Sequence, residues 1–279
     1  MNVVLTCINN FQEYILINIQ QLIKLEHINI YVITNSCFFN KFDEYKSNIK
    51  LIDLNSLNDS YNFENKTSLN KTFRNGFWTL TSSRFFYIYE FMKTYNISNV
   101  IHLENDVIIY YNCNRLFEFV DKSFLYIPFD TYNRNIASIM YIPNVETYKK
   151  ILDKYDFNKN DMENFSNLQK STNLIENFPI FLKSNNLTDE QQFVSSNSNI
   201  FPFIFDAAAI GQYLGGVDPR NINGNTKGFI NETCVIKYNN YNIFFEKDSK
   251  IRRPFILIED VKIPIFNLHI HSKNLKEFI

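Results

Sequence analysis

The sequence predicts an α/β fold with a mixed, mainly parallel central sheet flanked by helices. In the first half of the chain, short apolar runs alternate with longer segments that have helical spacing. A strand, a helix and a second strand at this spacing are typical of a right-handed βαβ unit, whose two strands run parallel. The 279 residues are 45% apolar and 16% aromatic, which is enough to fill the core of one large domain.

The first half contains four expected strands and two expected helices. Short apolar runs predict strands over residues 3–7, 28–33, 50–54 and 100–103. Apolar residues about one helical turn apart predict a helix over 11–25, and an aromatic-rich segment predicts another over 76–95. The polar stretch 55–73 is expected to be an irregular loop.

The second half is expected to be less regular. Its apolar runs predict strands over 125–129 and 136–142, followed by a helix over 144–155 and a short helix over 188–195 with Thr188 as its N-cap. The polar segment 156–186 is expected to be partly helical and to shape an acceptor site. The last third is expected to be irregular up to a final strand over 263–271.

Composition excludes several classes of protein. The apolar and aromatic content argues against disorder, and a net charge of −1 argues against a dedicated nucleic-acid binder. We expect no membrane span and no secretion signal. Four scattered cysteines match neither a zinc site nor a disulfide framework, so reduced thiols in a cytoplasmic protein are expected. Abundant Asn, Ile and Lys indicate an AT-rich genome, such as a viral one.

The triplet Glu104-Asn105-Asp106 directly follows the strand expected over 100–103. Two carboxylates at i and i+2 of an extended segment point to the same side. At the carboxyl end of a parallel strand they would open into the crevice where α/β folds bind ligands. Such a pair suits Mn²⁺ or Mg²⁺ bound to a diphosphate, and the metal would offset charge on a leaving phosphate. The similar pairs Asp161/Glu163 and Glu246/Asp248 are assigned no role.

The order of these motifs resembles the GT-A class of nucleotide-sugar glycosyltransferases. The helix segment Leu80-Thr81-Ser82-Ser83-Arg84-Phe85-Phe86 precedes the apolar strand that ends in Glu104-Asn105-Asp106. This order is most similar to glycosyltransferase family 8, which includes glycogenin and bacterial lipooligosaccharide galactosyltransferases. The resemblance implies a Rossmann-like GT-A fold. It also implies that Arg84 contacts the sugar nucleotide, that Asn105 lies at the cofactor site, and that Glu104 and Asp106 hold the metal.

The resemblance extends to further segments on both sides of the carboxylate pair. It implies that Thr6, Asn9 and Asn10 on the first strand and turn, together with Asp53 on the third strand, lie near the nucleotide base. The small-residue strand over 137–142 would lie below the sugar. The candidate catalytic residues are Asp130, which would touch the transferred sugar, and Asp189 and Gln191, which would open a helix beside the reacting carbon.

The C-terminal sequence His269-Ile270-His271-Ser272-Lys273 is the third feature that points to a metal site. Many GT-A enzymes complete the metal site with a late His and place a Lys on the diphosphate. A neutral imidazole is a good ligand for Mn²⁺, and whether His269 or His271 binds the metal stays open. Lys273 is assigned to the diphosphate.

The segment 206–219 contains three of the six glycines and a small-residue cluster. It is interpreted as a pocket wall in which Asp206 or Gln212 bonds sugar hydroxyls, and Asp206 is also a candidate catalytic base. The alternative is a tight packing element, because Gly215-Gly216 indicates a turn.

The predicted protein is one GT-A domain, residues 1–279, in which half 1–125 binds the nucleotide sugar and half 126–279 binds the acceptor. The predicted function is metal-dependent transfer of a sugar from a nucleoside diphosphate sugar, UDP-linked by expectation, to a glycan or another hydroxyl acceptor. Retention of configuration is favoured over inversion. The alternatives are a non-catalytic GT-A-like scaffold and a sugar-phosphate nucleotidyltransferase. The nucleotidyltransferase would place a Gly-rich basic loop after the first strand, whereas Cys7-Ile8-Asn9-Asn10 has neither Gly nor a basic residue.

Overall fold

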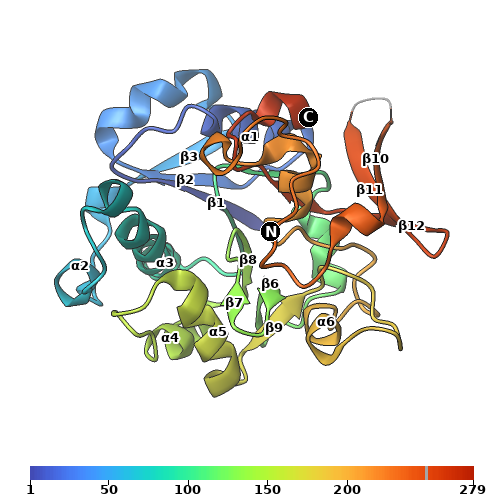
Figure 1. Ribbon diagram of the computed structural model, residues 1–279. Helices are drawn as coiled ribbons and strands as arrows, with labels where there is room; N and C mark the ends of the chain where they lie inside the picture. The colour runs from blue at the N-terminus through green and yellow to red at the C-terminus, as the bar shows by residue number, and fades with distance from the viewer. Residues whose placement is uncertain (249–250) are drawn as a thin grey trace.

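A central sheet organises the computed structural model, which describes residues 1–248 and 251–279 (Figure 1). Within these ranges its strands are β1 (Asn2–Cys7), β2 (Ile30–Thr34), β3 (Ile49–Asp53), β4 (Val100–Leu103), β6 (Leu125–Thr131), β7 (Arg134–Asn135), β8 (Ile139–Ile142) and β9 (Ile175–Phe178). Their order is β3-β2-β1-β4-β8-β6-β7, with β9 beside β6. The predicted α/β class is therefore confirmed.

The sheet is mixed and mainly parallel, as predicted. Strands β1, β2, β3 and β4 pair in parallel, whereas β8 runs antiparallel to both β4 and β6. The inner residues Val3, Val4 and Leu5 of β1 are fully buried. A parallel strand covered on both faces reads as a continuous apolar run, and this is why the first-half strands were recognisable in the sequence.

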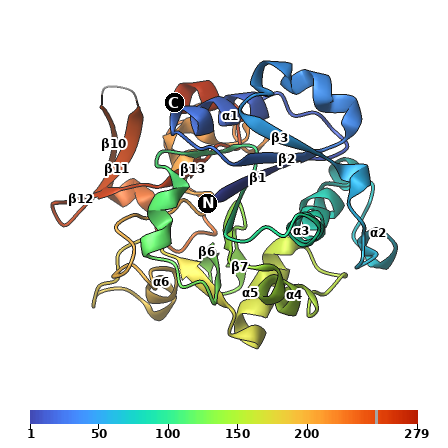
Figure 2. The same ribbon diagram turned by 180° about the vertical axis from the view of Figure 1, so that it is seen from behind.

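Helices cover both faces of the sheet. They are α1 (Ile15–Lys24), α2 (Phe63–Lys66), α3 (Phe77–Thr94), α4 (Val145–Leu152), α5 (Asp161–Thr172) and α6 (Asp189–Val194). Helix α1 lies on one side of β1 to β3, and α3, α4 and α5 lie on the other side (Figures 1 and 2). The predicted N-cap Thr188 is confirmed, because its side chain accepts from the Gln191 backbone in a capping box. No helix in the described parts of the chain is both long and apolar enough to span a membrane.

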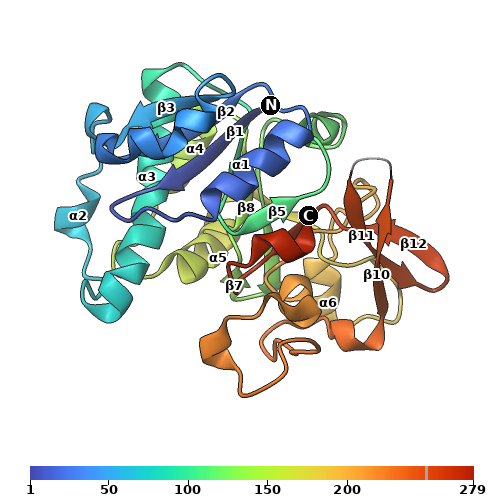
Figure 3. The same cartoon turned by 90° about the horizontal axis from the view of Figure 1, so that it is seen from above.

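The segment 156–186 is partly helical, as predicted, through helix α5, and it also contains the strand β9. The prediction for the last third is wrong in part. The region expected to be irregular forms a three-stranded antiparallel sheet of β10 (Asn242–Lys247), β11 (Arg252–Ile258) and β12 (Val261–Pro264), which projects from one edge of the molecule (Figures 1 and 3). β10 and β12 are exposed or partly exposed along their length, whereas β11 buries alternate residues, and the three strands stabilise one another through their cross-strand pairs.

The final strand predicted over 263–271 is split into two. β12 ends at Pro264, which has no N–H to continue a ladder. The chain then forms β13 (Asn267–His269; labelled in Figure 2), which pairs antiparallel with β5 (Val107–Ile109; labelled in Figure 3). This pairing returns the C-terminal residues to the strand that follows the carboxylate pair.

The prediction of free thiols is confirmed. Cys7, Cys113 and Cys234 are buried and unpaired, and Cys37 is exposed and unpaired.

Candidate active site

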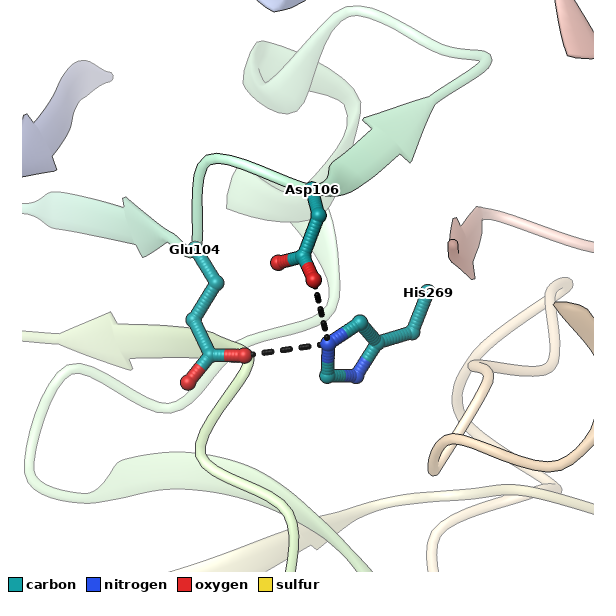
Figure 4. A group of neighbouring side chains, drawn as sticks. All are labelled: Glu104, Asp106 and His269. Carbon is teal, nitrogen blue, oxygen red and sulfur yellow. Dashed lines mark ion pairs between the residues drawn. The ribbon is translucent and has the colours of Figure 1, made fainter. Parts of the chain in front are cut away.

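Glu104 and Asp106 lie in a tight turn between β4 and β5, so the predicted extended segment is wrong. The Val107 backbone N–H donates to the Glu104 carbonyl at 3.0 Å and closes the turn. The two carboxylates nevertheless face the same side, toward His269 (Figure 4). The turn lies at the carboxyl end of β4, where the sequence places a ligand site.

Glu104, Asp106 and His269 form one cluster. The His269 Nε2 atom lies 3.1 Å from a Glu104 oxygen and 3.4 Å from an Asp106 oxygen (Figure 4). One ligand atom from each residue lies within 4.8 Å of the others. Asp106 and His269 are buried, and Glu104 is partly exposed. Two carboxylates and an imidazole nitrogen form a donor set suited to Mn²⁺, so these residues fit a divalent cation.

Ion pairing among Glu104, Asp106, His269 and the neighbouring basic side chains shifts the pKa values of the cluster. Burial opposes the charged form of both carboxylates, but Arg84 and His269 hold the pKa of Glu104 below its ordinary value, and Lys273 and His269 do the same for Asp106. Burial would lower the pKa of His269, yet Asp106 and Glu104 outweigh it and raise this pKa to about 9. Without a metal, a protonated His269 therefore occupies the position between the two carboxylates.

Arg84 projects from α3 and joins Glu104 to a third carboxylate, Asp161 at the start of α5. Its guanidinium forms an ion pair with Glu104, lies 3.3 Å from an Asp161 oxygen, and donates to the Ala137 carbonyl at 3.4 Å. Both Arg84 and Asp161 are buried. Sequence reasoning missed Asp161. Its only local signal is its place after the N-cap Asn160, which Glu163 shares.

Lys273 contacts the other carboxylate of the cluster, Asp106. The Lys273 amine lies 5.5 Å from the ring centre of Tyr14, a residue at the start of α1 to which the sequence analysis assigned no role. The Lys273 side chain is 43% exposed, so it is also accessible to solvent. This position suits the predicted contact between Lys273 and a phosphate group.

His271 lies beside the cluster but outside it. Its ring centre is 4.1 Å from that of His269, and the two rings are perpendicular. The His271 Nδ1 atom is 2.7 Å from the Gln212 side-chain amide. The geometry therefore places His269, and not His271, with the two carboxylates. The predicted role of Gln212 in bonding sugar hydroxyls stays a prediction.

Asp206 is fully buried and both of its oxygens are occupied. One oxygen accepts from the backbone N–H groups of Ala209 and Ile210, and the other accepts from Gly211 and His269, at 2.8 to 2.9 Å. A Cβ on Gly211 would lie 2.3 Å from the His269 carbonyl oxygen. The segment 206–211 therefore packs directly on the strand that carries His269, as the packing interpretation predicts.

The residues predicted for the nucleotide base lie at the ends of β1 and β3. Thr6 and Asp53 are half-buried, and Asn9 and Asn10 are exposed. The Asn9 backbone N–H donates to the Asn35 side chain at 2.7 Å. Asn105 differs from these residues, because its buried side-chain amide donates to the Thr6 carbonyl and to Gln12. Asn105 therefore ties the carboxylate turn to β1.

The remaining catalytic candidates on α6 lie near the end of β6. Asp189 is exposed at the first position of α6. The Gln191 side chain accepts from the Thr188 backbone and donates to the Val235 carbonyl at 3.2 Å. The catalytic roles of Asp189 and Gln191 stay predictions.

Asp130 on β6 is a buried carboxylate with one satisfied oxygen. That oxygen lies 3.0 Å from Arg134 and 3.5 Å from the Thr233 hydroxyl, and the other oxygen has no partner among the described residues. Burial, opposed in part by Arg134, raises the pKa of Asp130 to about 7. Its predicted contact with the sugar stays a prediction.

This raised pKa predicts a pH dependence of stability that Asp130→Asn removes. The folded protein binds the Asp130 proton more tightly than the unfolded chain, so the contribution is present at low pH and is lost as pH rises through about 7. The unfolding free energy of the wild type relative to Asp130→Asn should fall by roughly 2 to 4 kcal/mol between pH 4.5 and 8. Urea unfolding across this range measures the difference, and the exposed Asp59→Asn should show no comparable trend. A difference that is constant with pH would contradict the prediction.

No protein-family model and no curated protein sequence matches the chain. Solved structures similar to it include mouse xyloside xylosyltransferase 1, with 11% identity over 64% of this chain and 84% of that chain and a TM-score of 0.44. They also include an active-site mutant of the galactosyltransferase LgtC, with 11% identity over 71% of this chain and 83% of that chain and a TM-score of 0.46. A cytidylyltransferase from Leptospira borgpetersenii matches with 11% identity over 68% of this chain and 78% of that chain and a TM-score of 0.38.

Proposed function

We propose that this chain is a metal-dependent glycosyltransferase that uses a nucleoside diphosphate sugar, with UDP as the expected nucleotide, and a hydroxyl of a glycan or another acceptor. The observation that carries the proposal is the convergence of Glu104, Asp106 and His269 at the carboxyl end of β4, with one ligand atom from each within 4.8 Å. Arg84 forms an ion pair with Glu104, and Lys273 forms one with Asp106. Two acids, an imidazole and two basic side chains in one cluster suit a metal-bound diphosphate donor.

In this proposal Glu104, Asp106 and His269 hold Mn²⁺ or Mg²⁺. The cation supplies Lewis-acid stabilisation of the negative charge on the departing diphosphate when it is bound. The Lys273 amine, which contacts Asp106 and faces solvent, turns to a phosphate oxygen and adds electrostatic stabilisation. Arg84 fixes the orientation of Glu104 through their ion pair, and its contact with the donor stays an implication of the family resemblance.

We propose retention of configuration at the anomeric carbon. Inversion needs a carboxylate base within hydrogen-bond reach of the acceptor hydroxyl. Asp206 does not suit this role, since its two oxygens accept four backbone N–H groups. Asp130 and Asp189 are the candidate bases that inversion would still have.

A thermal-unfolding panel tests the donor site. Wild-type protein is heated with UDP, GDP, CDP and ADP, with their sugar conjugates, and with the nucleoside triphosphates, each with and without Mn²⁺. A ligand at 100 times its Kd should stabilise the fold by about 2.7 kcal/mol. We expect stabilisation by one nucleoside diphosphate or its sugar, and only when Mn²⁺ is present.

The panel also separates the alternatives. Stabilisation by a triphosphate but by no diphosphate sugar would favour a nucleotidyltransferase. A panel without any stabilisation would overturn the donor site and favour a binding scaffold. Turnover would then be tested with the sugar conjugate that stabilises the protein, by following the release of its nucleoside diphosphate over time.

A further inference from the structure

Asn18 on helix α1 is a buried polar residue that contacts the turn carrying Glu104 and Asp106. Its side-chain Nδ2 donates to the backbone carbonyls of Glu104 at 3.3 Å, Asn105 at 3.2 Å and Val107 at 2.9 Å. Asn18 is 0% exposed. One amide group thus binds three carbonyls that surround the carboxylate pair.

The turn is held from three other directions as well. The Glu104 N–H donates to the Ser138 carbonyl on the β8 side, and the Ile270 N–H donates to the Asp106 carbonyl on the β13 side. The Asn105 side chain donates to Thr6 on β1. Asn18 supplies the contact from α1, and it is the contact that reaches carbonyls on both sides of Asp106.

Asn at this position carries two energetic costs. The Asn18 Oδ1 atom is buried without a hydrogen-bond partner in the described structure, which is unfavourable. Asn is also a weak helix former inside a helix. Leu has the same number of side-chain heavy atoms and the same branching, and it would avoid both costs, but it would leave the three carbonyls without their donor.

His269 is held by a separate support. Its strand β13 is fixed by Asp206, which accepts the His269 N–H at 2.9 Å. The carboxylates and the imidazole therefore come from two segments, which the β5–β13 pairing joins and which Asn18 and Asp206 each hold from a different element. Metal ligands must lie within a few tenths of an ångström of their ideal distances, so the placement of the turn relative to β13 decides the affinity of the site.

We propose that Asn18 is a positioning residue for the metal site, which sets the placement of Glu104 and Asp106 by holding the backbone of their turn. The inference rests on the proposed function, because it takes this cluster to be a divalent-cation site. Asn18 acts through the turn and touches neither cation nor donor.

The test compares Asn18→Leu with Gln21→Met. Gln21 lies one turn later on the same face of α1, is equally buried, and donates through Nε2 to the Ile109 carbonyl at 2.9 Å. Its Oε1 atom also has no partner among the described residues. Each variant removes one buried amide donor, but only Asn18 contacts the turn itself.

Mn²⁺ affinity is measured without donor by titration with electron paramagnetic resonance, and stability is measured by urea unfolding without metal. We expect both variants to lose similar stability, and Asn18→Leu alone to weaken Mn²⁺ binding by about 10-fold or more. Equal Mn²⁺ affinity in the two folded variants would overturn the inference. If Asn18→Leu does not fold, Asn18→Ser keeps one donor, and its Mn²⁺ affinity should fall below that of Gln21→Met. Wild-type protein that binds neither Mn²⁺ nor Mg²⁺ would instead overturn the proposed function.

Discussion

Asp106→Asn is expected to lower both Mn²⁺ affinity and the rate of donor turnover by at least about 100-fold, since even the outer partners of metal ligands contribute 10- to 100-fold. Asp106 is buried beside His269 and contacts Lys273. The amide has nearly the same shape but no charge, so it weakens the cation site while it keeps the packing of the turn. The variant should therefore remain folded.

The measurements are Mn²⁺ titration of the free protein and release of nucleotide from the donor that the thermal panel identifies. The matched control is Asp153→Asn, which removes an exposed carboxylate that pairs with Lys149 on α4. This control should bind Mn²⁺ like the wild type. Unchanged Mn²⁺ affinity in Asp106→Asn would exclude Asp106 as a ligand.

Asp206→Ala is expected to cause the largest loss of stability. The carboxylate accepts four backbone N–H groups at 2.8 to 2.9 Å with no exposure to solvent. Hydrogen bonds to a charged group contribute about 1.5 to 3 kcal/mol each, so their loss should cost roughly 5 kcal/mol or more. Because whole domains are stable by only about 5 to 15 kcal/mol, the variant should be largely unfolded at 37 °C.

Urea unfolding at low temperature, where the variant retains structure, measures this loss. Asp121→Ala is the control, because Asp121 is exposed and accepts one backbone N–H, from Ser123. The control should lose no more than about 1 kcal/mol. If Asp206→Ala instead keeps wild-type stability and loses only turnover, Asp206 returns to the catalytic role that the sequence allowed.

Much of the fold of residues 1–125 could be predicted from the sequence. Strands β1 to β4 and helix α3 follow from continuous apolar runs and aromatic spacing, because elements buried on both faces carry their own signal. The turn with Glu104 and Asp106 was located by its place after a buried strand. The late histidines were selected as candidates by motif order, and the structure brings only His269 to the two carboxylates.

The tertiary structure alone decided which polar residues support this site. Asp161 contacts Arg84, which is 77 residues away in the sequence, and Asn18 contacts Val107, which is 89 residues away. Neither has a local pattern that separates it from exposed neighbours such as Glu163. Whether a polar side chain is buried, and which groups it satisfies there, depends on segments that are far apart in sequence and meet only in the folded chain. The sequence therefore determined most strands and helices and the residue types of the candidate metal ligands. The packing of segments that are distant in sequence determined which buried polar residues, such as Asn18 and Asp161, hold those ligands in place.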